Sequence, residues 1–460
     1  MSAPVLRRGL RGFGTLLIIL SAISPASSVF IIAPGVLTTA GSGAFISFAA
    51  AAVVGVFMAF VYAELSSAFP LAGGEYAMVT RTLGRLPGFV VLGLMIVTQI
   101  MIVAVIALGI GQYVGAVIPG VSGTVVAAVV CLVAGGVAVF DVKVNAWVTG
   151  VFLAVELLAL AVVCVLGFMN SARPFSELVL HPVGADGSSV GMGAIVVATS
   201  VAIFAYNGYG SAAYFGEETQ DAAKSIARIV ILALLVTVLA EILPVTAVLM
   251  GAPDLPALFS AESMMTYFVN VRGGSTLELV LSIAVALAIA NAVLAIMLLT
   301  SRLIFSTARD RAWIRPINQS LSTVHPKFGT PWIASLVVGV LSAALCFVDE
   351  QVLLVATSSG IVVVCAMLCI GAIVGRHNGS TAHGIYKMPL FPLAPVLAFL
   401  ALAFVVYQSA LDPDVGRPSL YVTGGIALLS VVYYLVRFRN RGGWQVAEDA
   451  VEPVPAVAAD

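Results

Sequence analysis

The chain has 460 residues and a formal net charge of -1; 61% of the residues are hydrophobic, only 9% are charged, and the mean hydropathy is +1.12. Because soluble domains carry about 25% charged residues, a water-soluble globular protein is excluded. The small net charge also excludes the basic surface of a nucleic-acid-binding protein. At about 20 apolar residues per membrane helix, this length and composition predict a polytopic membrane protein.

Long apolar runs, bounded by glycine, proline and charged residues, predict membrane-spanning helices, because lipid-exposed backbone must satisfy its hydrogen bonds internally. The runs are continuous rather than alternating, which excludes a transmembrane β-barrel. The predicted fold class is therefore an all-α polytopic membrane protein with twelve transmembrane helices. The runs cover residues 13–38, 43–69, 89–117, 124–140, 146–169, 191–215, 229–252, 276–300, 331–347, 353–375, 389–410 and 419–436.

Lysine and arginine predict the orientation, because short cytoplasmic loops carry an excess of both. With the amino terminus placed in the cytoplasm, all but three of the 21 basic residues fall on the cytoplasmic side. Both termini are therefore expected in the cytoplasm, and the chain is expected to be a multi-pass protein of the plasma (inner) membrane. The cytoplasmic set includes Arg7, Arg8, Arg302 and Arg441, and the three exceptions are Arg173, Arg272 and Arg417.

The sequence does not contain the residue patterns typical of metal sites, disulfide frameworks, nucleotide binding or enzyme catalysis. The five cysteines fall inside apolar runs and the four histidines fall in polar connections, so neither a metal site nor a disulfide framework is expected. The sequence contains no phosphate-binding Gly-x-x-x-x-Gly-Lys-Ser/Thr loop and no nucleophile–base motif. We therefore expect no enzyme activity and no cofactor.

Two of the runs contain residues that interrupt a helix. The first run contains Ser24-Pro25-Ala26-Ser27-Ser28, in which Pro25 lacks an amide hydrogen and frees carbonyls of the preceding turn. The sixth run contains Asn207-Gly208-Tyr209-Gly210-Ser211, in which the glycines disfavour helix and Asn207 competes for backbone hydrogen bonds. Kinks of this kind also serve close packing. Their positions five runs apart, however, favour an inverted repeat whose paired interruptions mark a transporter's central site.

Three stretches resemble the amino acid–polyamine–organocation (APC) transporter superfamily. The first is Ala26-Ser27-Ser28-Val29-Phe30, where small residues replace two glycines of the family pattern. The second is Tyr62 to Tyr76, which looks like the exit of the family's second span. The third runs from Ser301 to Pro331 and includes Val324-His325-Pro326-Lys327-Phe328-Gly329-Thr330-Pro331, close to the loop between spans eight and nine. The resemblance covers residues 12–440.

The chain departs from the family pattern after the sixth run. Glu218 and Lys224 keep the acid and the base of that pattern, but two prolines are missing. Gly210 stands where many members carry an acid. These departures leave the substrate open.

The resemblance implies a transport core of two five-helix repeats in opposite orientation, with a substrate pocket midway through the membrane. Two additional helices would follow the core, and a cytoplasmic tail would lie at each end. The implied segments are a tail at 1–12, a core at 13–375 with repeats at about 13–169 and 191–375, two further helices at 389–436, and a tail at 437–460.

The residues of the two breaks predict how a zwitterion would bind. Backbone amides freed at the first break suit a carboxylate, and serine hydroxyls there add uncharged donors. Carbonyls on both breaks would accept hydrogen bonds from an ammonium group, whose burial without partners is costly. Phe204 aligns with the aromatic gate of the family. The predicted substrate-binding residues are Ile23, Ala26, Ser27, Ser28, Phe204, Ala205, Tyr206, Asn207 and Gly208.

Only two acids lie well inside apolar runs, Glu156 and Glu241. An acid at bilayer depth costs about 2.5–3.5 kcal/mol on insertion scales and normally has a partner or a proton-carrying role. Each is therefore a candidate for proton coupling or for contact with a cationic substrate, and the alternative is a protonated acid bonded to a neighbouring carbonyl. Asn291 and Gln99 are weaker candidates.

The sequence predicts a secondary active transporter of amino acids or related amines that works by alternating access. Proton-driven symport is the preferred mode, and amino acid or polyamine exchange and sodium symport remain alternatives. A channel or a transport-like sensor is the alternative from another class. The expected partners are a small-molecule substrate, a coupling ion and the lipid bilayer.

Overall fold

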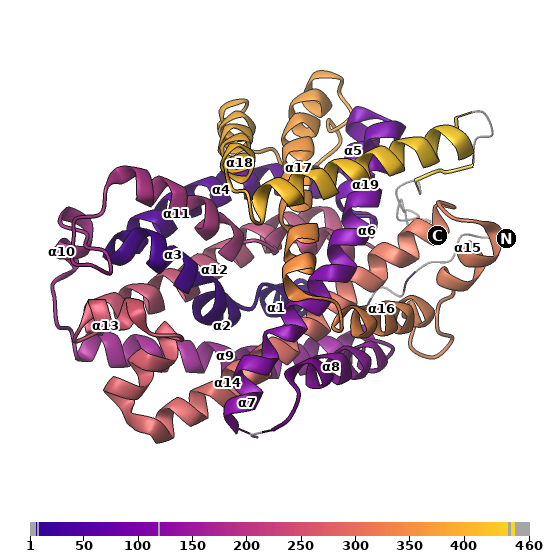
Figure 1. The fold of residues 1–460 in the computed structure, drawn as a ribbon. Coiled ribbons are helices and arrows are strands. Elements are labelled where there is room, and N and C mark those ends of the chain that lie inside the picture. Colours follow the sequence, from indigo (N-terminus) through magenta and orange to yellow (C-terminus); the bar gives the residue numbers. More distant parts are fainter. Residues whose placement is uncertain (1–5, 7–8, 118–119, 440–442, 447–460) are drawn as a thin grey trace, which may run out of the picture.

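The computed structural model describes residue 6 and residues 9–117, 120–439 and 443–446. Most of the two predicted tails, including Arg7, Arg8 and Arg441, therefore lies outside the described residues. The described part consists of helices and their connections, together with two isolated β-bridges. Figure 1 shows the helices packed into one bundle, with segments far apart in sequence lying against each other.

The first half of the chain forms α1 (Gly12–Ile23), α2 (Pro25–Ser27), the π-helix η1 (Ser28–Ile32), α3 (Ala33–Ala40), the 3-10 helix η2 (Gly41–Gly43), α4 (Ala44–Ala68), α5 (Glu75–Leu83), α6 (Arg85–Leu108), α7 (Ile110–Val117), α8 (Gly123–Val137), α9 (Val142–Met169), α10 (Phe175–Leu180) and α11 (Met192–Ala205). The second half forms the 3-10 helix η3 (Tyr209–Phe215), α12 (Ala222–Gly251), α13 (Leu255–Ser260), α14 (Met264–Arg309), α15 (Arg315–Leu321), α16 (Trp332–Leu345), α17 (Glu350–His377), α18 (Leu393–Leu411) and α19 (Gly416–Arg437).

The long helices have the length and composition of membrane spans. Within the described residues, nine helical stretches are long and apolar enough to cross a bilayer, and the stretch Gly12–Ala68 is interrupted at Ser24 and again at η2. Two shorter apolar helices, α8 and α16, accompany them. Every predicted run coincides with helical structure. The run 276–300 lies within α14, whose backbone leaves helical geometry at Gly274, just before the run begins, and whose helix continues to Arg309. The chain thus has the architecture of a polytopic helical membrane protein.

Small residues allow pairs of these helices to approach closely. A Cβ atom added to Gly135 of α8 would lie 3.1 Å from the Cα atom of Gly339 in α16. A Cβ atom added to Gly251 of α12 would lie 2.5 Å from the Cα atom of Gly167 in α9. Membrane helices associate through such close backbone contacts, because lipid tails provide no hydrophobic drive to bring them together.

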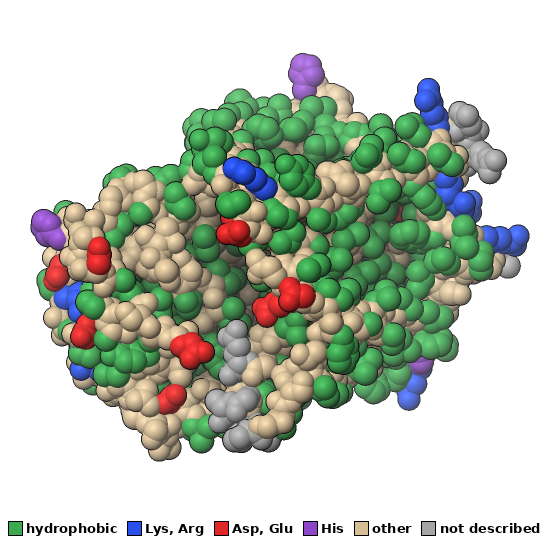
Figure 2. Space-filling view, viewed as in Figure 1, with side chains coloured by type: hydrophobic (Ala, Val, Ile, Leu, Met, Phe, Trp, Pro, Cys, Tyr) green, Lys and Arg blue, Asp and Glu red, His purple; other side chains and the backbone are tan. Residues whose placement is uncertain are grey.

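The outer surface is apolar, as a lipid-facing surface must be. Large hydrophobic side chains on α19 are exposed, among them Leu428, Leu429 and Val436. Figure 2 shows hydrophobic side chains over much of the visible face, whereas Lys and Arg gather mainly at the end where α15 lies and α19 finishes. We call this the α15 end.

A segment beyond the last predicted run is anchored at the α15 end. Trp444 is 1% exposed, and its ring packs against Phe89 with 5.1 Å between ring centroids. The backbone amide of Gln445 donates to the carbonyl of Asp310 at the end of α14, with a distance of 3.1 Å. Residues 443–446 therefore tie α14 to α6 beside the end of α19.

An ion pair joins α4 to α17. The carboxylate of Glu64 is fully buried and accepts two hydrogen bonds from Arg376, each with a distance of 2.6 Å. It accepts a third from the Met388 amide, at 2.9 Å. Arg376 is 23% exposed, so water still reaches part of its guanidinium. The sequence alone indicates only that Glu64 lies near a span end.

Replacing Glu64 by glutamine is expected to lower the free energy of unfolding by about 1–3 kcal/mol, because charged hydrogen bonds are lost from a buried group. Arg376 is partly hydrated, which keeps the loss at this moderate level. Denaturation of the purified protein in detergent measures the effect, and E262Q at an exposed position is the control. Equal stability of E64Q and E262Q would contradict the importance of this pair.

Candidate functional site

The first break lies between α1 and α2. Ser24 adopts a left-handed conformation with φ 50°, while its amide still donates to the Leu20 carbonyl. The reason is local: Pro25 has no amide hydrogen and disfavours helical geometry in the residue before it. Helical structure restarts at Pro25 and passes through η1, which is a π-helix. Such π-helical turns often occur at functional sites.

The second break lies between α11 and η3. The helix ends at Ala205, and Gly208 adopts φ 119°, a conformation that L-residues with side chains rarely adopt. The side-chain oxygen of Asn207 accepts a hydrogen bond from the Gly208 amide at 2.9 Å. The chain then continues as the tighter η3 helix. Both signals seen in the sequence, the glycine and the asparagine, therefore act at the break itself.

The two breaks are in contact with each other. The Ser28 hydroxyl donates to the Ala205 carbonyl across a distance of 3.1 Å. A Cβ atom added to Gly208 would lie 2.9 Å from Cγ1 of Ile23, so the second break packs directly on the end of α1. Residues 177 positions apart in the chain thus share one hydrogen bond at the point where both helices are interrupted.

Glu156 of α9 binds the first break. Its Oε1 atom accepts one hydrogen bond from the Ala26 amide at 2.8 Å and another from the Ser24 hydroxyl at 2.9 Å. The residue is fully buried, and its Oε2 atom has no hydrogen-bond partner. The carboxyl group therefore lies where the sequence predicts the carboxylate of a substrate.

Glu241 of α12 lies close enough to Ser28 and Glu156 to interact with them electrostatically. It is fully buried, and neither carboxyl oxygen has a hydrogen-bond partner. Within the described part of the chain, neither Glu156 nor Glu241 forms an ion pair. Two carboxyl groups without a basic partner therefore stand beside the breaks.

The other predicted site residues divide into two groups. Residues of the first break, with Ala205 and Tyr206, are buried, and the Tyr206 hydroxyl donates to the Phe48 carbonyl. Phe204 and Asn207 are partly exposed and line a mostly apolar pocket formed by α4, α11, α17 and α18, which Tyr206 also borders. No residue from 23–28 lines that pocket. The structure thus brings the two breaks together but places Phe204 and Asn207 on a neighbouring pocket.

Gly210 is covered by an aromatic ring. A Cβ atom added to Gly210 would lie 2.4 Å from the Tyr62 ring, and the Tyr62 hydroxyl donates to Oε1 of Glu75 at 3.2 Å. Glu75 is 2% exposed, and its Oε2 atom has no hydrogen-bond partner. The acid that many family members carry at position 210 would not fit here.

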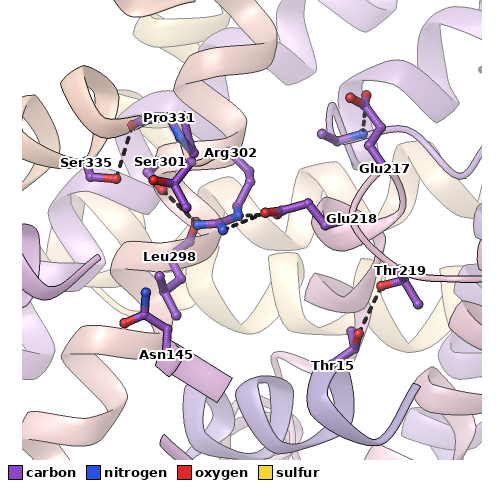
Figure 3. Close-up of polar contacts among 12 residues, drawn as sticks. Thr15, Asn145, Glu217, Glu218, Thr219, Leu298, Ser301, Arg302, Pro331 and Ser335 are labelled. Atoms are coloured by element: carbon purple, nitrogen blue, oxygen red, sulfur yellow. Dashed lines mark hydrogen bonds and ion pairs between the residues drawn. The ribbon is translucent and has the colours of Figure 1, made fainter. Parts of the chain in front are cut away.

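A network of buried polar side chains, which the sequence does not predict, lies beside the start of α1 (Figure 3). Arg302 binds both carboxylate oxygens of Glu218, at 2.6 and 3.0 Å, and both side chains are buried. Arg302 lies within α14 rather than in the loop that follows it, and its charge is neutralised by Glu218 rather than by solvent. Arg309 makes a similar pair with Glu217 at 2.6 Å. Arg302 stands in a stretch that carries the resemblance, and Glu218 keeps the acid of the family pattern after the sixth run, but the sequence does not show that the two residues pair.

The same network holds the segment that precedes α1. The amides of Gly9 and Leu10 donate to the Glu218 carbonyl, and the hydroxyls of Thr15 and Thr219 are 2.9 Å apart. The start of the first broken helix is therefore fixed to the loop that follows the second. Separation of the two at this end would require these bonds to break.

A polytopic bundle in which two interrupted helices meet, with buried carboxyl groups beside them, defines a membrane transporter built on discontinuous helices. Comparison with known proteins agrees: residues 10–433 match the family model of amino acid permeases. The chain belongs to this family, and hence to the APC superfamily.

Three relatives illustrate the range of the family. The chain is 31% identical over 374 residues to an uncharacterized transporter of Mycobacterium tuberculosis, covering 81% of this chain and 80% of the relative. It is 25% identical to a branched-chain amino acid permease of Bacillus subtilis, covering 87% and 88%. It is 24% identical to a serine/threonine exchanger of the same organism, covering 81% and 83%.

Proposed function

We propose that this protein is a secondary active transporter that carries an amino acid or a related amine across the plasma membrane by alternating access. The observation that carries the proposal is the contact between the two breaks, because freed backbone groups are tolerated at membrane depth where they line a site or are buried in protein. Movement of the helices that carry the breaks would expose that site to each side in turn.

The proposed topology has twelve crossings, with both termini in the cytoplasm and two inverted repeats at about 13–169 and 191–375. The positions of the basic residues support it, since all but three fall on one side when the chain crosses at every predicted run. The gathering of Lys and Arg at the α15 end fits the same orientation.

Proton-driven symport is the proposed mode, with Glu156 or Glu241 as the proton carrier. Both are buried carboxyl groups beside the breaks, and a buried carboxylate without a cationic partner is costly. Exchange is the second candidate, and the likeness to a serine/threonine exchanger favours it. Sodium symport of the same fold is a third. A channel would want a continuous polar pore or rings of charge, whereas these acids are few.

Purified protein in liposomes is expected to accumulate one or more radiolabelled amino acids, polyamines or quaternary amines against a gradient. Uptake should saturate with substrate concentration and should require an inward proton gradient but no sodium gradient. Empty liposomes are the control. Uptake that occurs only when the liposomes contain substrate would indicate exchange instead of symport. A flux that does not saturate with substrate concentration would contradict a transporter.

A further inference from the structure

The Ala26 amide and the serine hydroxyls of the first break already form hydrogen bonds within the protein. The Ala26 amide and the Ser24 hydroxyl both donate to Oε1 of Glu156. The hydroxyls of Ser24 and Ser27 are 2.7 Å apart, so Ser27 can donate to Ser24 once Ser24 donates to the carboxyl group. The Ser28 hydroxyl donates to Ala205. A substrate carboxylate finds these donors taken by the protein's own acid.

Ionised and protonated forms of Glu156 hold these donors with different strength. Hydrogen bonds to a carboxylate are about twice as strong as those between neutral groups. A proton on Glu156 therefore weakens its hold on Ala26 and Ser24. Two carboxylates on the same donors, in a site without a basic residue, would repel each other at high cost.

The elements packed against Glu156 bring one other acid and several uncharged groups to it. The helix α9 packs against α1, α2, α12 and α14. From α12 comes Glu241, the neighbouring titratable group, and from the first break come the uncharged groups of Ser24 and Ala26. From α14, Asn291 donates to the Thr149 carbonyl two turns away on α9.

We infer that Glu156 and the carboxylate of the substrate compete for the Ser24 and Ala26 donors, so that a proton must bind Glu156 before the substrate carboxylate takes its place. This inference rests on the proposed function and specifies how the proton and substrate are coupled. A proton from solvent binds a carboxylate oxygen of Glu156 and forms an O–H bond, the two hydrogen bonds from Ser24 and Ala26 pass to the substrate, and no other covalent bond forms or breaks. Proton and amino acid then bind with positive cooperativity.

Comparing the binding of amino acids with that of the matched amines, which lack the carboxylate, tests this mechanism in the unmodified protein. The probes are L-valine against isobutylamine and L-serine against ethanolamine, from about pH 5 to about pH 8, where aliphatic amines keep their charge. The affinity for a bound amino acid should fall with rising pH by up to about tenfold per unit, as expected for one linked proton. The affinity for the matched amine should stay flat. An amino acid that binds with a flat profile would overturn the inference.

Substitutions of Glu156 test whether this residue causes the pH dependence of amino acid binding. E156Q should bind the amino acid with a flat pH profile, whereas E262Q, which removes an exposed acid away from the two breaks, should keep the slope. E156D keeps a titratable acid but is one methylene shorter, so its competition should weaken and its affinity at high pH should rise. An unchanged slope in E156Q would overturn the role of Glu156. Failure of all amino acids and amines in the uptake screen would instead count against the proposed function.

Discussion

Replacing Gly208 by valine is expected to reduce transport to less than about a tenth of the normal rate. The backbone of Gly208 has φ 119°, where a side chain adds about 1–2 kcal/mol of strain or more, and β-branched residues fit least well. The new Cβ atom would also lie 2.9 Å from Ile23, which forms the end of α1 at the first break. The substitution therefore pushes the two breaks apart.

Uptake into liposomes measures the effect, and size-exclusion chromatography shows whether the variant stays folded. G424V is the matched control, because a Cβ atom at Gly424 of α19 meets no neighbour within 4 Å. G208A should fall between the two, since it adds the strained Cβ atom without branching. Normal uptake by G208V would show that the contact between the breaks is not required.

The second large effect is expected at the buried ion pair between α14 and the loop after η3. R302M should lower the free energy of unfolding by about 3–5 kcal/mol, because it leaves the Glu218 carboxylate buried without its partner. The double variant R302M/E218L should recover much of this loss, because removing both charges avoids the uncompensated one. Denaturation in detergent measures both.

R315M, at an exposed position in α15, is the control for loss of an arginine as such. A labelling readout accompanies the stability measurement: a cysteine introduced at Thr219 should react faster with a polar thiol reagent in R302M, because the pair holds that loop against the start of α1. Equal stability and equal labelling in R302M and in the R315M control would show that the ion pair between Arg302 and Glu218 does not hold this loop in place.

The fold follows from local signals to a large extent. Each apolar run coincides with helical structure, because burial in lipid demands continuous hydrophobicity. Pro25 and Gly208 mark the breaks, because each changes the backbone at its own position. Such effects need no knowledge of the rest of the chain.

The site depends on contacts that no local pattern contains. Glu156 stands out in the sequence as a membrane acid, yet its bond to Ala26 joins residues 130 positions apart. Arg302 resembles a loop residue because it is charged, and only the packing of α14 against Glu218 explains its burial. The cover that Tyr62 gives to Gly210 is likewise set by packing between α4 and η3.

A structure of the protein by electron cryomicroscopy, with a substrate identified in the uptake screen bound to it, tests the account most directly. We predict ligand density between Ala26–Ser28 and Phe204–Gly208, with Glu156 withdrawn from the Ala26 amide when that substrate carries a carboxylate. Density confined to the apolar pocket formed by α4, α11, α17 and α18, with no contact to residues 26–28 and with both breaks unchanged, would contradict it.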